Sequence, residues 1–226
     1  MKKVSFLVPA FNHASYVKAT LDSIWLDDYP NKEIVIVNDG SSDNTADIIK
    51  KWGEEKKWQG IVYRERENRG ITRTLNELIE ISTGEFIRIF SSDDLLKYGS
   101  TQKMVRILES DSSAAAIFGD ADVIDGNDVV IHTSMLEMNG ANKRRLSNEK
   151  CLPQEIVSNW AVSGPVLLIR KEYYKKLGMY DENLLVDDWD MYLRLLCTGG
   201  LRYIDDYVAS YRIHGGNVSR TRLREK

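Results

Sequence analysis

The first half of the chain alternates short apolar runs with amphipathic stretches, and this alternation limits the possible folds more than any other feature. The runs that read as strands are Val4–Val8, Glu33–Val37, Ile61–Tyr63 and Glu85–Phe90. The stretches with apolar residues at helical spacing are Tyr16–Trp25, a segment from Asp43 to Trp52, and Gly70–Ile81. This order is typical of parallel strands joined by crossover helices. We therefore expect an α/β fold with a mostly parallel central sheet flanked by helices.

The second half is less regular and predicts a mixed α+β arrangement. The expected strands are Ala114–Phe118, Val166–Ile169, Leu201–Ile204 and Tyr207–Ile213, with a hairpin around Gly126-Asn127. Helices are expected around Met104, from Lys171, and from Asp188 to Cys197. Residues 134–150 have weak periodicity and are expected to form a mobile or partly helical insertion. Because 226 residues usually form one core, we expect a single domain.

Composition and charge exclude several classes of protein. The 31 basic and 34 acidic residues give a net charge of −3, which lacks the excess needed to hold nucleic acid. No apolar run approaches the length of a membrane span, and the start of the chain has too short an apolar patch for a signal peptide. The two cysteines, Cys151 and Cys197, form no metal-binding or disulfide pattern. We expect a protein of the reducing cytoplasm.

Polar residues follow three of the four early strands at their carboxyl ends. They are Pro9-Ala10-Phe11-Asn12, Asn38-Asp39-Gly40-Ser41 and Ser92-Asp93-Asp94. Open parallel sheets bind ligands at this edge, although each segment taken alone reads equally well as a turn. The stretch after the first strand has no glycine, whereas dinucleotide and ATP sites usually place a glycine-rich loop there. NAD and ATP enzymes are therefore disfavoured.

Six sequence blocks together resemble one known family. They are Val4–Asn12, Ile36–Thr45, Asn68–Ile87, Ser92–Asp94, Val186–Asp190 and Tyr211–Ser219. In this order they resemble the inverting family 2 glycosyltransferases, which have the GT-A fold, a nucleotide-diphospho-sugar transferase fold. The resemblance implies one domain over 1–226, with a nucleotide-binding half at 1–98 and an acceptor-binding half at 99–226.

The resemblance assigns a set of residues to the nucleotide-sugar donor. Asp39 matches the position that accepts a hydrogen bond from the imide N–H of uracil or thymine. Phe11 is expected in the pocket wall or in the core, and Arg73 beside the diphosphate or exposed to solvent. The full set is Pro9, Ala10, Phe11, Asn12, Asp39, Asn68, Gly70, Arg73, Ser92 and Asp93.

The resemblance also implies a divalent cation, Mn²⁺ or Mg²⁺, beside the diphosphate. A leaving diphosphate gains negative charge, which a hard cation with oxygen ligands stabilises. Asp93 and His214 match the ligand positions, although a lone histidine on a strand is more often structural. The family usually has an aspartate where this chain has Ser91, which weakens the expected contact to the donor ribose.

Inversion at the sugar carbon requires a carboxylate that takes the proton of the acceptor hydroxyl. Asp188 matches this position, and its neighbour Asp187 replaces the commoner glutamate. The residues expected at the acceptor are Trp160, Gly164, Asp187 and Trp189. The alternative is a helix cap for Asp187, a simple turn for Gly164 and a place in the core for the two tryptophans.

The predicted function is transfer of a sugar from a UDP-sugar or dTDP-sugar to a hydroxyl of a glycan or lipid-linked saccharide. The setting implied is bacterial surface polysaccharide synthesis in the cytoplasm. Two basic clusters, Lys143-Arg144-Arg145 and Arg220–Lys226, suggest peripheral contact with the inner face of the plasma membrane, or only a solvated surface. The alternatives are an inactive nucleotide-sugar-binding module and a nucleotidyltransferase that makes nucleotide sugars. The sequence does not reveal an oligomeric state.

Overall fold

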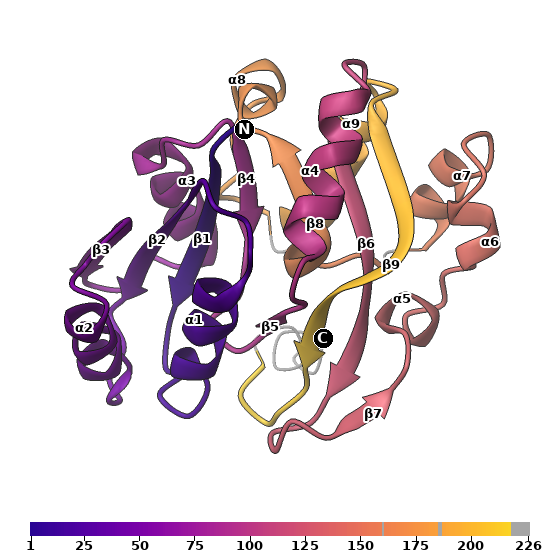
Figure 1. Cartoon of the computed structure of the whole chain (residues 1–226). Helices are drawn as coiled ribbons and strands as arrows, with labels where there is room; N and C mark the ends of the chain where they lie inside the picture. Colours follow the sequence, from indigo (N-terminus) through magenta and orange to yellow (C-terminus); the bar gives the residue numbers. More distant parts are fainter. Residues whose placement is uncertain (160, 185–186, 218–226) are drawn as a thin grey trace.

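One central sheet runs through both halves of the protein in this computed structural model, which describes residues 1–159, 161–184 and 187–217 (Figure 1). Its strands are β1 (Val4–Ala10), β2 (Lys32–Asp39), β3 (Ile61–Arg66), β4 (Phe86–Ile89), β5 (Leu95–Leu96), β6 (Ala116–Ile124), β7 (Val130–His132), β8 (Leu167–Arg170) and β9 (Leu201–Arg212). Its helices are α1 (Val17–Leu26), α2 (Thr45–Glu55), α3 (Ile71–Ile81), α4 (Ser100–Ser110), α5 (Met135–Met138), α6 (Lys143–Leu146), α7 (Leu152–Ser158), α8 (Glu172–Leu177) and α9 (Asp187–Leu196), with a 3₁₀ turn η1 (Gly164–Val166).

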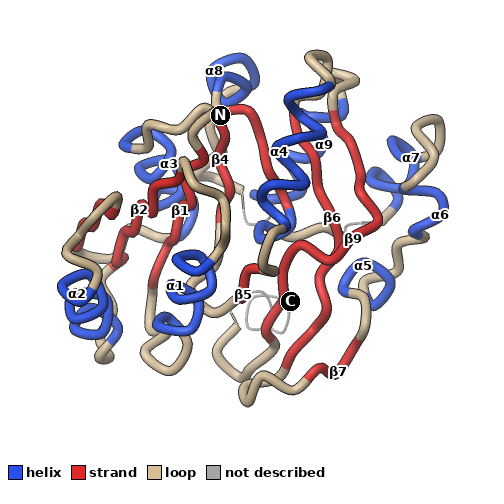
Figure 2. Tube along the Cα trace, in the orientation of Figure 1, coloured by secondary structure: helices blue, strands red, loops and turns tan. Residues whose placement is uncertain are grey.

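The strand order across the sheet is β3-β2-β1-β4-β8-β6-β9-β5, and β7 pairs with β6. Figure 2 draws the strands in red. The four strands of the N-terminal half are parallel, as the sequence predicts. The C-terminal half is mixed, because β8 is antiparallel to both β4 and β6, whereas β6 and β9 are parallel. The carboxyl ends of β1, β2 and β4 therefore meet at one edge.

Burial on both faces explains why the early strands are nearly continuous apolar runs. All seven residues of β1 are buried, and only the first residue of β2 is not. The chain passes from β1 to β2 through α1 and from β2 to β3 through α2, and then returns from β3 to β4 through α3. Because such crossovers are right-handed, the reversal places α3 on the face of the sheet opposite α1 and α2. None of the described helices is both long and apolar enough to cross a bilayer.

The C-terminal half differs from the sequence prediction in two places, the closing strands and β5. The two closing strands are one strand, β9, because Asp205 and Asp206 lie in its exposed middle and pair with Lys143 and Lys103. Strand β5 follows the Asp93 loop and pairs with β9 at the far edge of the sheet. Residues 134–150 contain the short helices α5 and α6, and α7 follows them. The predicted hairpin around Gly126-Asn127 is confirmed by the β6–β7 pair.

Glu33 ties together the amino ends of the strands, opposite the predicted ligand edge. Its carboxylate accepts hydrogen bonds from Lys3 at 2.7 Å, Ser5 at 2.5 Å and the Thr83 backbone N–H at 2.6 Å. Burial raises the pKa of Glu33, but these hydrogen bonds outweigh burial and lower the pKa to about 2. The charged carboxylate therefore joins β1, β2 and the segment before β4.

We predict that Glu33→Gln lowers the free energy of unfolding at pH 7 and weakens its dependence on acid. The folded-state pKa of about 2 lies below the ordinary 4.5, so the contribution of Glu33 is complete above pH 4.5 and is lost as the pH falls toward 2. Urea unfolding at several pH values should show the wild type and the variant converging in this range. A constant difference between them down to pH 2 would contradict this assignment.

Candidate active site

Asp39, at the end of β2, anchors the loop that leads into α3. The carboxylate is 4% exposed and accepts the backbone N–H groups of Arg69 at 2.8 Å and Gly70 at 3.0 Å. The guanidinium of Arg66 also pairs with it, and the Asn68 side chain donates to the Asp39 carbonyl at 2.9 Å. The structure thus brings together Asp39, Asn68 and Gly70. Only one of these bonds reaches Oδ2, so this oxygen keeps the capacity to accept another donor.

The end of β1 lies beside the loop after β2. Ala10 is buried, whereas Phe11 is 40% exposed, which removes the alternative that Phe11 is a core residue. Asn12 adopts a positive φ of 54° and accepts the backbone N–H of Ser42 at 2.8 Å. The Ser41 hydroxyl accepts the Asn12 backbone N–H at 3.0 Å. Pro9, the residue before Ala10, pairs in register with Val37 of β2, so both loops begin side by side.

Arg73 points to a partner in the second half of the chain. Its side chain is 60% exposed and forms an ion pair with Glu182 at 2.7 Å. The exposed alternative for this residue therefore agrees with the structure.

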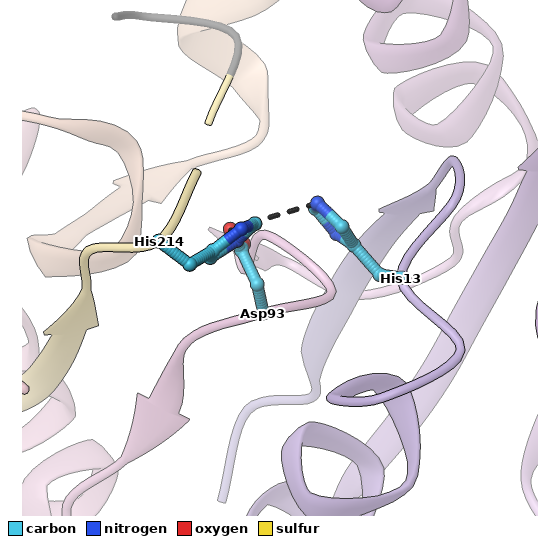
Figure 3. A group of neighbouring side chains, drawn as sticks. All are labelled: His13, Asp93 and His214. Atoms are coloured by element: carbon cyan, nitrogen blue, oxygen red, sulfur yellow. Dashed lines mark hydrogen bonds and ion pairs between the residues drawn. The ribbon is translucent and has the colours of Figure 1, made fainter. Parts of the chain in front are cut away.

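Asp93, His214 and His13 converge on one point, as Figure 3 shows. Nε2 of His214 lies 3.0 Å from Oδ2 of Asp93, and Nε2 of His13 lies 3.7 Å from the same oxygen. The candidate ligand atoms of the three residues all lie within 4.8 Å of one another. Two imidazole nitrogens and a carboxylate oxygen form a donor set that suits a divalent cation. The predicted ligands Asp93 and His214 are thus brought together.

The proton positions of the two imidazoles follow from their other contacts. His214 Nδ1 accepts the Gly216 N–H at 3.1 Å, so Nε2 carries the proton and donates it to Asp93. A cation that binds His214 Nε2 has to displace this proton. Burial lowers the pKa of His13 below its ordinary value and outweighs the opposing charge of Asp93. His13 is therefore neutral at neutral pH and retains a lone pair on one ring nitrogen.

Arg212 holds the Asp93 loop against the end of β9. Its guanidinium donates to the Asp93 carbonyl at 2.6 Å, and its backbone N–H donates to Asp94 Oδ1 at 2.8 Å. The Tyr16 ring lies against the same guanidinium, 4.9 Å away. Burial and the neighbouring Asp93 charge raise the pKa of Asp94 well above its ordinary value. Asp94 is therefore a buried residue that helps to hold the Asp93 loop against β9.

Asp188 lies in the first turn of α9, beside Gly164. A methyl group on Gly164 would lie 3.9 Å from both carboxylate oxygens of Asp188 and from the Ile89 side chain. Ile89 is the last residue of β4, the strand that continues into the Asp93 loop. Asp188 and Gly164 also line one small cavity together with Ile89 and Tyr192. The structure therefore brings the predicted base to the glycine of the predicted acceptor loop and to the end of β4.

The other acceptor predictions have mixed outcomes. Trp189 is half-buried and donates from its indole nitrogen to the Ile156 carbonyl at 3.3 Å, which fixes α9 against α7. The backbone of Asp187 begins α9, but its side chain lies outside the described residues, as does Trp160.

Three residues that contact this site are not among the site residues predicted from the sequence motifs. His13 follows the end of β1, and its place at the ligand edge is the signal that marks it. Asn217 donates to Asp93 Oδ2 at 3.3 Å, and Arg66 pairs with Asp39. Their roles come from contacts between segments that are distant in sequence, which local patterns do not encode.

The family model for glycosyl transferase family 2 matches residues 5–178 of this chain. The chain belongs to glycosyl transferase family 2. This match includes the ends of β1, β2 and β4 together with Gly164, and it confirms the family that the sequence motifs predict. As a member of this family, the protein is a glycosyltransferase.

Curated relatives agree with the family. An uncharacterized glycosyltransferase of Rickettsia typhi is 27% identical over 225 residues, covering 98% of this chain and 67% of the relative. The poly-β-1,6-N-acetyl-D-glucosamine synthase of Staphylococcus epidermidis is 28% identical over 198 residues, covering 84% of this chain and 46% of the synthase. This chain thus spans about half the length of the synthase.

Solved structures share the fold. The mannosyltransferase PcManGT of Pyrobaculum calidifontis, in complex with GDP-Man and Mn²⁺, has a TM-score of 0.76 at 21% identity, covering 99% of this chain and 61% of that one. S. aureus TarS 1-349 in complex with UDP-GlcNAc has a TM-score of 0.74 at 18% identity, covering 95% of this chain and 60% of that one. These likenesses confirm the GT-A fold.

We predict that Gly40→Ala destabilises the protein more than Gly199→Ala does. Both glycines have positive φ angles, 71° and 69°, but a methyl group on Gly40 would lie 2.6 Å from the Asn68 backbone nitrogen, whereas one on Gly199 meets nothing within 4 Å. The backbone strain shared by both variants costs about 1 kcal/mol. The clash at Gly40 should add roughly 2 kcal/mol. Urea unfolding measures both, and equal losses would show that the contact between the two loops is dispensable.

Proposed function

We propose that this chain is a metal-dependent inverting transferase that moves a hexosyl group from a UDP-sugar to a hydroxyl of a glycan or lipid-linked saccharide; a dTDP-sugar is the second donor candidate. The observation that carries this proposal is the convergence of Asp93 and His214 near the end of β4, with Asp188 beside the same strand end. Asp39 lies at the parallel end of β2, on the same edge.

Asp93 and His214 are the proposed ligands for Mn²⁺ or Mg²⁺. When bound, the cation supplies positive charge that stabilises the diphosphate leaving group. Arg212 and Asn217 keep the Asp93 loop in place, because both donate hydrogen bonds to Asp93. Asn217 also accepts the His214 backbone N–H at 2.5 Å, so one side chain contacts both proposed ligands.

The donor is proposed to lie along the loops after β1 and β2. Oδ2 of Asp39 has the remaining capacity to accept the single imide N–H of uracil or thymine. Pro9, Ala10, Phe11 and Asn12 form the adjoining wall, and the exposed ring of Phe11 offers an apolar face to the base.

Asp188 is the proposed general base. Its carboxylate accepts the proton of the acceptor hydroxyl while the hydroxyl oxygen forms a bond to the anomeric carbon. The bond from that carbon to the diphosphate oxygen breaks, and the electron pair leaves with the diphosphate. Attack from the face opposite the leaving group inverts the carbon. Gly164 leaves space beside the carboxylate, because a larger side chain there would contact both oxygens.

The proposed setting is surface polysaccharide synthesis at the cytoplasmic face. The name of the S. epidermidis synthase supports the setting, and the UDP-GlcNAc bound by TarS supports the donor class. In the basic cluster Lys143-Arg144-Arg145, Lys143 pairs with Asp120 and Asp205, and Arg145 pairs with Glu155. These acidic partners neutralise part of the positive charge, so the cluster supports membrane contact less than its sequence suggests. The other basic cluster, 220–226, lies outside the described residues.

We predict that Asp188→Asn lowers kcat by about 10²- to 10⁴-fold, because the amide cannot take the acceptor proton. The matched control is Asp190→Asn in the same helix, where Asp190 forms a partly exposed ion pair with Arg194. Initial rates of UDP release with a panel of acceptor saccharides measure the effect. A variant that keeps full activity would refute the proposed base, and a wild type that binds donor without turnover would favour an inactive binding module.

We predict that UDP-sugars raise the melting temperature more than GDP-mannose does, and that Mn²⁺ increases the difference. Binding to the folded state alone adds about 2.7 kcal/mol when the ligand is at 100 times its Kd. A melting panel of UDP-GlcNAc, dTDP-glucose and GDP-mannose, each with Mn²⁺ or EDTA, needs no acceptor. Stabilisation by GDP-mannose alone would overturn the uracil assignment.

A further inference from the structure

Three segments that are distant in sequence bring one side chain each to the point shown in Figure 3. His13 follows β1, Asp93 follows β4 and His214 follows β9. The family resemblance accounts for Asp93 and His214 but gives His13 no role. His13 nevertheless lies as close to the shared Asp93 oxygen as a cation site requires, with its Nε2 3.7 Å from Oδ2.

The orientation of the His13 ring is fixed on several sides. Its Nδ1 lies 2.8 Å from the Ser92 hydroxyl, and its backbone N–H donates to the Thr45 hydroxyl at 2.9 Å. The ring packs edge-on against His214, with centroids 5.4 Å apart. When Nδ1 donates to Ser92, the lone pair of the neutral ring is on Nε2, which faces Asp93.

Hydrogen bonding alone does not explain this arrangement. The 3.7 Å separation between His13 Nε2 and Asp93 Oδ2 is too long for a hydrogen bond. The same oxygen already accepts from His214 and from Asn217. The two imidazole nitrogens lie 3.0 Å and 3.7 Å from the Asp93 oxygen. These separations match ligands around one cation, because two atoms that each lie about 2.0–2.2 Å from a metal are at most about 4.4 Å apart.

We propose that His13 is a third protein ligand of the cation, and that Ser92 is the residue that orients it. This inference rests on the proposed function only in assuming that the site binds a divalent cation. Ser92 then acts through His13 rather than through the donor ribose. The cation joins the loop after β1 to the ends of β4 and β9, so it bridges the two halves of the sheet.

This ligand set determines which cations the site prefers. Mg²⁺ and Ca²⁺ favour oxygen ligands, whereas imidazoles suit first-row transition metals. Two histidines and one carboxylate therefore favour Mn²⁺, Co²⁺ or Zn²⁺ over Mg²⁺. Loss of His13 leaves one imidazole and one carboxylate, and this should weaken transition-metal binding more than Mg²⁺ binding.

The test measures Mn²⁺ alone on the whole chain, without sugar nucleotide. Calorimetry and the electron paramagnetic resonance of bound Mn²⁺ should show His13→Ala binding Mn²⁺ at least about tenfold more weakly than the wild type. The chain has three histidines, and His132 is exposed on β7, so His132→Ala is the matched control and should bind as the wild type does. Ser92→Ala should weaken binding less than His13→Ala. Circular dichroism and melting curves establish that each variant is folded.

A spectroscopic count of imidazoles makes the result independent of affinity. Electron spin echo modulation from histidine nitrogen should show two imidazoles on Mn²⁺ in the wild type and one in His13→Ala and in His214→Ala. His13→Asp should restore Mn²⁺ binding without restoring the second nitrogen signal. A wild type with one bound imidazole, or unchanged Mn²⁺ affinity in His13→Ala, would overturn the proposal. A protein that binds Mn²⁺ through two imidazoles but transfers no sugar would refute the proposed function and leave this inference standing.

Discussion

The contact between Arg212 and the Asp93 loop is the interaction on which the rest of the site depends. The buried guanidinium donates to the Asp93 carbonyl, and the backbone of the same residue donates to Asp94. It thereby fixes the end of β9, which leads to His214, against the loop that follows β4. A buried charged donor is costly to leave without an acceptor, so this arrangement has few alternatives. The side chains from the two halves of the chain meet because their backbones are held here.

Asp39 has a corresponding role in the N-terminal half. Both of its oxygens accept backbone N–H groups at the start of α3, and Arg66 pairs with it. The close approach of Gly40 to Asn68 permits this packing. Buried carboxylates thus hold the loops at the ligand edge, while Glu33 joins the opposite ends of the same strands. Hydrogen bonds to buried carboxylates therefore fix the strands at both ends, whereas the middle of the sheet is held by apolar packing.

The sequence predicts the elements and residues that depend on local patterns, and it does not predict contacts between segments that are distant in the chain. The predicted strands and helices of the first half match β1 to β4 and α1 to α3, because their periodicity is local and strong. Asp39, Asp93, Asp188 and His214 lie in short motifs, so the sequence alone marks them as candidate site residues. The sequence leaves Arg73 either beside the donor or exposed to solvent, and only the structure shows that it pairs with Glu182, more than a hundred positions away in the sequence. No local pattern encodes that contact.

The sequence by itself determined the family, the parallel direction of the first four strands and the polar residues at the carboxyl ends of three of them. Alternating apolar patterns and short motifs carry this information within a few residues. Only the tertiary structure decided that His13 joins Asp93 and His214, that Asp188 lies beside Gly164, and that β5 pairs with β9 at the far edge. These outcomes depend on how segments tens to hundreds of residues apart pack together. Pairing between distant strands is set by the whole core, and the pattern of any one segment is compatible with several partners.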